Sequence, residues 1–90
     1  MRGLEVNTFF LLMAQYNKAV IPVDTVCKDY FSHLTPEKFV RKIAIGEIEL
    51  PLVRIEASQK CAKGVHLQDL AAYLDKRREA AIKETRALFG

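Results

Sequence analysis

Hydrophobic residues recur at helical spacing over residues 22–31. Three or four positions separate them, which places them on one face of a helix; they are Val23, Val26, Cys27, Tyr30 and Phe31. Pro22 suits the first helical turn, because its missing N–H would have had no partner there. The pattern therefore predicts a helix from Pro22 to Phe31.

A second helix is predicted from Pro36 to Ile45, and its two faces differ. Thr35 is a favourable N-cap residue, and Gly46 can adopt the left-handed conformation that ends a helix. At about 100° per residue, one face is apolar and the opposite face is basic. The apolar face carries Phe39, Val40 and Ile43, and the opposite face carries Lys38, Arg41, Lys42 and Ile45.

Two further helices are predicted at the ends of the chain. Residues 7–16 form an apolar run that we interpret as a helix, with Thr8 as its N-cap. Residues 67–89 predict a long helix, with His66 helping to cap it. Its first half is expected to pack on the domain, while its second half projects or meets a second copy through Leu74, Ala81 and Leu88. Arg77 and Arg78 interrupt any heptad seam.

A β-hairpin is predicted between these helices. Residues 50–57 contain β-branched residues in partial alternation, which predicts a strand. Residues 58–64 are polar and end in glycine, so they predict the hairpin loop, and Val65 and His66 predict the returning strand.

Composition points to one small domain, residues 1–90, without enzymatic chemistry. The net charge of +3 permits binding to a polyanion without establishing it. Cys27 and Cys61 lie far apart and do not fit a zinc site, and His33 and His66 are interpreted as structural. The chain has no glycine-rich phosphate loop, HExxH motif or nucleophile elbow, so we expect no enzyme and no cofactor. The apolar run at residues 9–14 is too short to cross a bilayer, so we expect a soluble, cytoplasmic protein.

The order of elements predicts a mainly α fold with a small β-hairpin, a winged helix-turn-helix of the excisionase or MerR type. Residues 36–45 are then the recognition helix for the major groove, and residues 58–64 are a wing on the backbone or minor groove. A basic helix face alone is usually solvated surface, but its combination with a short turn and a basic loop favours DNA. The predicted DNA contacts are Thr35, Lys38, Arg41, Lys42, Ile45, Arg54, Ser58, Gln59, Lys60 and Lys63.

Several stretches resemble the pyocin-activator (PrtN) family over roughly residues 7 to 85. They are FLLMAQYN from Phe10, VIPVDTVCKDYFSHLTPEKFVRKI, GEIELPLVRIEASQK and KGVHLQDLAAYLDKRREAA. Members of that family are bacterial transcription activators of phage-tail-like bacteriocin genes, acting at short promoter repeats. The resemblance implies a bacterial, nucleoid-associated activator of prophage-derived genes.

Two other functions remain open at this stage. One is an excisionase-like architectural protein that bends DNA without recruiting polymerase, and the other is a protein-interaction adaptor that uses the C-terminal helix. For the activator, the expected partners are double-stranded promoter DNA, RNA polymerase and a second copy of the chain.

Overall fold

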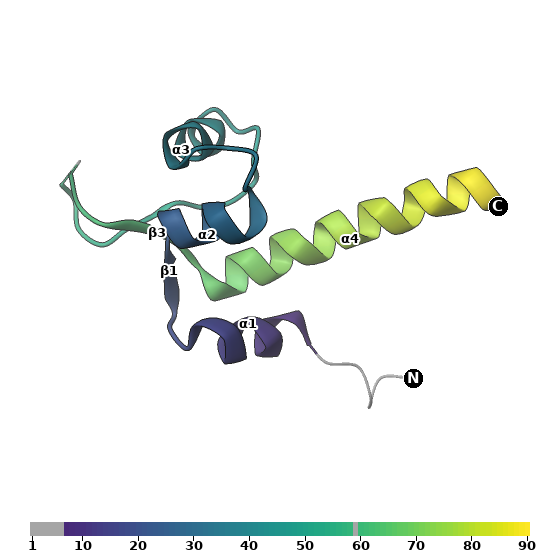
Figure 1. Ribbon diagram of the computed structural model, residues 1–90, viewed down its shortest axis with the longest axis horizontal. Helices are drawn as coiled ribbons and strands as arrows, with labels where there is room; N and C mark the ends of the chain where they lie inside the picture. The colour runs from purple at the N-terminus through teal and green to yellow at the C-terminus, as the bar shows by residue number, and fades with distance from the viewer. Residues whose placement is uncertain (1–6, 59) are drawn as a thin grey trace.

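A computed structural model describes residues 7–58 and 60–90 of the chain. Over these residues it is mainly helical, with a three-stranded antiparallel sheet, which confirms the predicted balance of α and β structure. In Figure 1, α3 and α1 lie on opposite sides of α2, and α4 extends past the other elements. In chain order the elements are α1 (Thr8–Tyr16), β1 (Val20–Pro22), α2 (Val23–Tyr30), α3 (Pro36–Ala44), β2 (Val53–Arg54), β3 (Lys63–His66) and α4 (Leu67–Phe89).

Both ends of α3 follow the sequence signals closely. The hydroxyl oxygen of Thr35 accepts a hydrogen bond from the backbone N–H of Lys38 at 3.2 Å, so Thr35 is the N-cap. Gly46 has a φ of +82°, which L side chains rarely adopt. The N–H of Gly46 donates to the carbonyl of Ile43, and that of Glu47 donates to the carbonyl of Lys42. These two bonds form a Schellman motif, which satisfies carbonyls that the helix end would leave unpaired.

Two predicted helix starts are wrong by one residue. Asn7, rather than Thr8, caps α1, because its side chain accepts from the N–H of Phe9 at 2.7 Å. Thr8 lies inside the helix and donates its hydroxyl to Asp75 at 2.7 Å, which ties α1 to α4. Pro22 lies before the first turn of α2, with an extended backbone (φ −56°, ψ 145°), because it is also the last residue of a strand.

That strand, β1, was not predicted, and it makes the sheet three-stranded instead of a lone hairpin. The strand order is β1-β3-β2, with Ile21 opposite Val65 and Pro22 opposite Gly64. A Cβ on Gly64 would come within 2.5 Å of the Ile21 carbonyl oxygen, so the close approach of β1 requires glycine. The first hairpin strand is also shorter than the predicted 50–57, since β2 holds only Val53 and Arg54, and the returning strand begins earlier, at Lys63.

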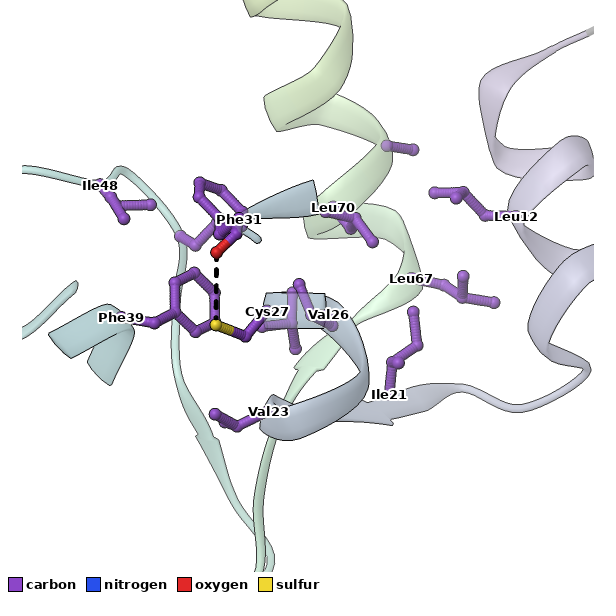
Figure 2. Packing of buried hydrophobic residues seen from close by; sticks show 13 residues of the cluster. Leu12, Ile21, Val23, Val26, Cys27, Phe31, Phe39, Ile48, Leu67 and Leu70 are labelled. Atoms are coloured by element: carbon purple, nitrogen blue, oxygen red, sulfur yellow. Dashed lines mark hydrogen bonds between the residues drawn. The ribbon is translucent and has the colours of Figure 1, made fainter. Parts of the chain in front are cut away.

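The core lies where α2 meets α3, α4, α1 and the sheet. Its fully buried large side chains come from these separate elements: Phe39, Ile21, Leu70, Val26 and Val65. Figure 2 shows the α2 side chains between those of α3 on one side and those of α4 and α1 on the other. The ring of Phe31, just after α2, lies 4.6 Å from that of Phe39 and 5.8 Å from that of Tyr73, centroid to centroid. This aromatic group joins α3 and α4 through one residue.

The start of α4 is fixed by the sheet. His66 is its N-cap, with Nδ1 accepting from the N–H of Gln68 at 3.0 Å, as the sequence predicted. The N–H of Leu67 donates to the carbonyl of Ala19 at 2.9 Å, which attaches the helix to the segment before β1. Its second half extends beyond the domain, as expected (Figure 1), and Leu88 and Phe89 are exposed.

Candidate nucleic-acid interface

The predicted recognition helix has one buried and one exposed side. Phe39 has no exposed surface, whereas Ile45 is 62% exposed, and Lys38 and Arg41 are exposed as well. We call Lys38, Arg41, Lys42 and Ile45 the contact stripe; their spacing of three, four and seven residues places them on one face of α3 and its C-cap. The structure therefore brings together these four predicted site residues.

The turn between α2 and α3 is held from inside. The Cys27 thiol donates to the carbonyl oxygens of Leu34 at 3.2 Å and Phe31 at 3.5 Å, and the N–H of Leu34 donates to the carbonyl of Phe31. Burial, with a smaller contribution from Asp24, raises the pKa of the Cys27 thiol, so it remains a protonated donor. Figure 2 shows the hydrogen bond from the Cys27 thiol to the Phe31 carbonyl oxygen. These contacts fix the angle at which α3 leaves the turn.

One cation of the contact stripe is already paired. Nζ of Lys42 lies 2.8 Å from Oε1 of Glu47, and both side chains are about half exposed. In the Schellman motif these residues occupy the positions that commonly touch through apolar side chains, so here an ion pair takes that place. This ion pair was not predicted, although Gly46 at the helix end was a signal that the chain turns back toward Lys42.

The hairpin carries the second group of predicted contacts. Arg54 and Lys63 are direct cross-strand partners, so both side chains emerge on the same face of the β2–β3 ladder. In the loop, the hydroxyl of Ser58 accepts from the N–H of Lys60 at 3.1 Å, and Lys60 is exposed. The predicted contact Gln59 lies outside the described residues.

A cleft of about 520 Å³ separates the hairpin from the N-terminal turns of α3. On the helix side it is lined by Pro36, Glu37 and Val40, and on the hairpin side by Cys61, Ala62 and Lys63. The contact stripe is absent from this lining. The contact stripe and the predicted contacts of the hairpin therefore lie on different sides of α3 and do not form one continuous patch.

A further link connects α1 to the helix pair. The phenol of Tyr16 donates a short hydrogen bond to the carboxylate of Asp29 on α2. Burial, together with this bond, raises the pKa of the Tyr16 phenol above its ordinary value. Tyr16 thus acts as a neutral donor that ties α1 to α2.

The family model for the pyocin activator protein PrtN matches residues 8–81, which is most of the chain. The chain belongs to this family. No curated protein and no solved structure matches the chain significantly. The PrtN match confirms the resemblance seen in the sequence, and it spans α1, the α2–α3 pair, the hairpin and α4 as far as Ala81.

Within residues 7–58 and 60–90, no group of three His, Cys, Asp or Glu side chains is placed to hold a metal ion. Over the same residues, none of the helices is long and apolar enough to cross a membrane.

Proposed function

We propose that this PrtN-family protein is a winged helix-turn-helix activator that binds the promoter DNA of bacteriocin genes. The observation that carries the proposal is the division of α3: Lys38, Arg41 and Ile45 of the contact stripe are exposed, whereas Phe39 on another face is fully buried. A B-DNA major groove is about 12 Å wide and admits one helix. A helix anchored by one face and cationic on another is suited to enter it.

Within the contact stripe, the residues have different proposed roles. Arg41 is one turn before the C-terminus of α3, and its guanidinium matches the acceptor edge of guanine. Ile45, with most of its surface exposed, offers an apolar contact for a thymine methyl group. Lys38 is a compact charge suited to phosphate. Thr35, used as the N-cap, is a candidate phosphate contact beside it.

The hairpin is the proposed wing. Arg54 and Lys63 share one face of the ladder and would together neutralise phosphates on one strand. Ser58 shapes the loop by accepting from the N–H of Lys60, and this supports an outward position for the Lys60 side chain. Gln59 completes the proposed set in the same loop. These contacts position the protein and carry no base preference by themselves.

The test is a mobility-shift and footprint experiment on bacteriocin promoter DNA with Arg41→Ala and Lys60→Ala. Arg41→Ala is expected to cost about 1–3 kcal/mol and to blur base preference at one position, whereas Lys60→Ala weakens all sequences alike. Lys83→Ala, which removes one exposed charge from the far part of α4, is the control and should leave binding nearly unchanged. Small and equal effects of Arg41→Ala and Lys60→Ala would contradict the proposal.

This function places the protein in the bacterial cytoplasm at the nucleoid, with RNA polymerase as a second partner. An excisionase-like architectural role would use the same interface, so an in vitro transcription assay separates the two: bending without activation favours the architectural role. An adaptor role is favoured only by the exposed end of α4. A protein complex that survives the joint loss of Lys38, Arg41 and Lys42 would support that role instead.

A further inference from the structure

The face of α4 that packs in the core continues beyond the domain. Leu67, Leu70 and Ala71 are buried in its first turns, and Leu74 packs against the core. At the helical repeat, the same face continues along the projecting half of the helix. We call this continuation the distal stripe; it consists of Arg78, Ala81, Ile82, Thr85, Leu88 and Phe89.

Four of the six side chains of the distal stripe are apolar, and most of the stripe is exposed. Leu88 is 80% exposed and Phe89 is 86% exposed. A shallow hollow of about 350 Å³ lies over Ala81, with Arg78, Ile82, Thr85 and Arg86 around it. The small side chain of Ala81 at its centre would let a second helix approach closely.

Two charged side chains beside the distal stripe, Arg77 and Glu84, have no opposite charge three or four residues away in the helix. The positions three and four residues away from Arg77 are Leu74, Tyr73, Ala80 and Ala81. Those around Glu84 are Ala80, Ala81, Ala87 and Leu88. Neither side chain forms an ion pair with another described residue. By contrast, Glu79 has Lys83 four residues later, which is a favourable helical spacing.

We propose that the distal stripe binds a second copy of the chain, with the two α4 helices antiparallel and centred near Ala81. A twofold axis perpendicular to the plane of the two helices relates the copies. It leaves each residue on the same side of that plane and reverses its position along the helix direction. Arg77 therefore lies beside Glu84 of the partner subunit, and the contact occurs twice. Leu74 and Leu88 lie at matching distances from the centre, so apolar contacts flank the charged ones.

Charge order selects the antiparallel arrangement. A parallel pair would place the cationic segment at residues 76–78 level with the same segment of the partner. The antiparallel pair instead places that segment level with Glu84 of the partner subunit. Residues 75–89 span about 22 Å of helix, which suits a modest, reversible dimer more than an obligate one.

The experiment measures the oligomeric state of the full chain by sedimentation velocity, with Arg77→Glu and Glu84→Arg as the diagnostic variants. The wild-type chain is expected to dimerise, and each single charge reversal should weaken the dimer at least about tenfold. An equimolar mixture of the two variants should form a heterodimer, because each unlike pair is restored. Lys83→Glu, the same charge reversal on the opposite face of α4, is the control and should leave the dimer intact.

Circular dichroism checks that each variant keeps its helix content. A wild-type monomer, or a dimer that neither charge reversal affects, would overturn the proposal, as would two variants that fail to associate when mixed. The result does not depend on DNA binding. A mobility shift on the same samples distinguishes failure of this proposal from failure of the proposed promoter-binding function.

Discussion

Glu47 and Lys42 lie 2.8 Å apart across the C-terminal end of α3, oxygen to nitrogen. An ion pair this exposed contributes at most about 1 kcal/mol to folding. Its larger consequence is electrostatic, because it partly neutralises one of the three cations of the contact stripe. If α3 binds DNA as proposed, the pair would restrain its nonspecific attraction to DNA.

Replacing Glu47 with Gln is expected to strengthen DNA binding. Lys42 becomes free to pair with a phosphate, so the slope of log K against log salt should steepen by about 1. The slope is about −4 to −5 if the three cations of α3 and the two of the hairpin loop, Lys60 and Lys63, all neutralise phosphates. Titrations of labelled promoter DNA over a range of salt concentrations measure both quantities.

The control for this change is Glu47→Gln combined with Lys42→Ala. Without the lysine, removal of the acid should give only a small gain in affinity from the general change in charge. Weaker binding by Glu47→Gln alone would show that Glu47 itself helps to position the interface.

Gly64 is expected to be the least replaceable glycine. An added Cβ meets the Ile21 carbonyl oxygen at 2.5 Å and a Val20 methyl carbon at 2.6 Å, so β1 has to move. Gly64→Ala should lower the free energy of unfolding by about 1–3 kcal/mol, measured by denaturant titration.

Gly46 provides the contrast, because a Cβ there meets nothing within 4 Å and only its φ of +82° is unfavourable. Gly46→Asn should cost less than Gly46→Ala, since asparagine tolerates the left-handed region better. Equal losses for the two Gly46 variants would mean that the Schellman turn does not retain its conformation.

The cap of α3 gives a third prediction. Thr35→Ala removes the acceptor for the N–H of Lys38 and should cost about 1 kcal/mol of stability. Thr35→Ser keeps the oxygen and should remain close to wild type in thermal unfolding. A similar loss in both variants would place the importance of Thr35 in its methyl group instead.

Stability should fall as the pH rises above about 9, in part because of Cys27. Burial raises the pKa of this thiol above its ordinary value of 9.0, so the folded state holds the proton more tightly than the unfolded state. The contribution of the protonated Cys27 thiol to the free energy of unfolding is complete below pH 9. It is lost as the pH rises through the pKa of the thiol in the folded state. Chemical unfolding between pH 8 and 10 should show this decline in the wild type and a shallower one in Cys27→Ala.

Thiol labelling provides an independent check on the same residue. In the folded protein, Cys61 is partly exposed and should react readily, whereas Cys27 is buried and should react only on unfolding. Rapid modification of both thiols in the native state would contradict the buried, hydrogen-bonded position of Cys27.

The sequence predicted the helices well because their signals are local. The apolar spacing of α2 and the Thr35, Pro36 and Gly46 signals of α3 all act within a few residues. The division of α3 into an apolar and a basic face followed from the same repeat. The predicted contact residues themselves await a binding measurement.

The missed features depend on contacts between distant segments. Strand β1 has only three residues and ends in proline, so its pairing with β3 leaves no alternation to detect. Asn7 and Thr8 are both good caps, and the hydrogen bond from Thr8 to Asp75, 67 residues away, is not visible locally. The cross-strand pairing of Arg54 with Lys63 depends on the register of the hairpin, which the sequence pattern of residues 50–66 does not determine.

Phe31 touches both Phe39 of α3 and Tyr73 of α4, so one ring sets how these helices are inclined to each other. In a twofold dimer built on α4, the packing of α3 against α4 within each protomer would fix the distance between the two copies of α3. Such a dimer would bind two half-sites only at one fixed spacing along the duplex. Inserting a few base pairs between paired half-sites would rotate one of them out of reach.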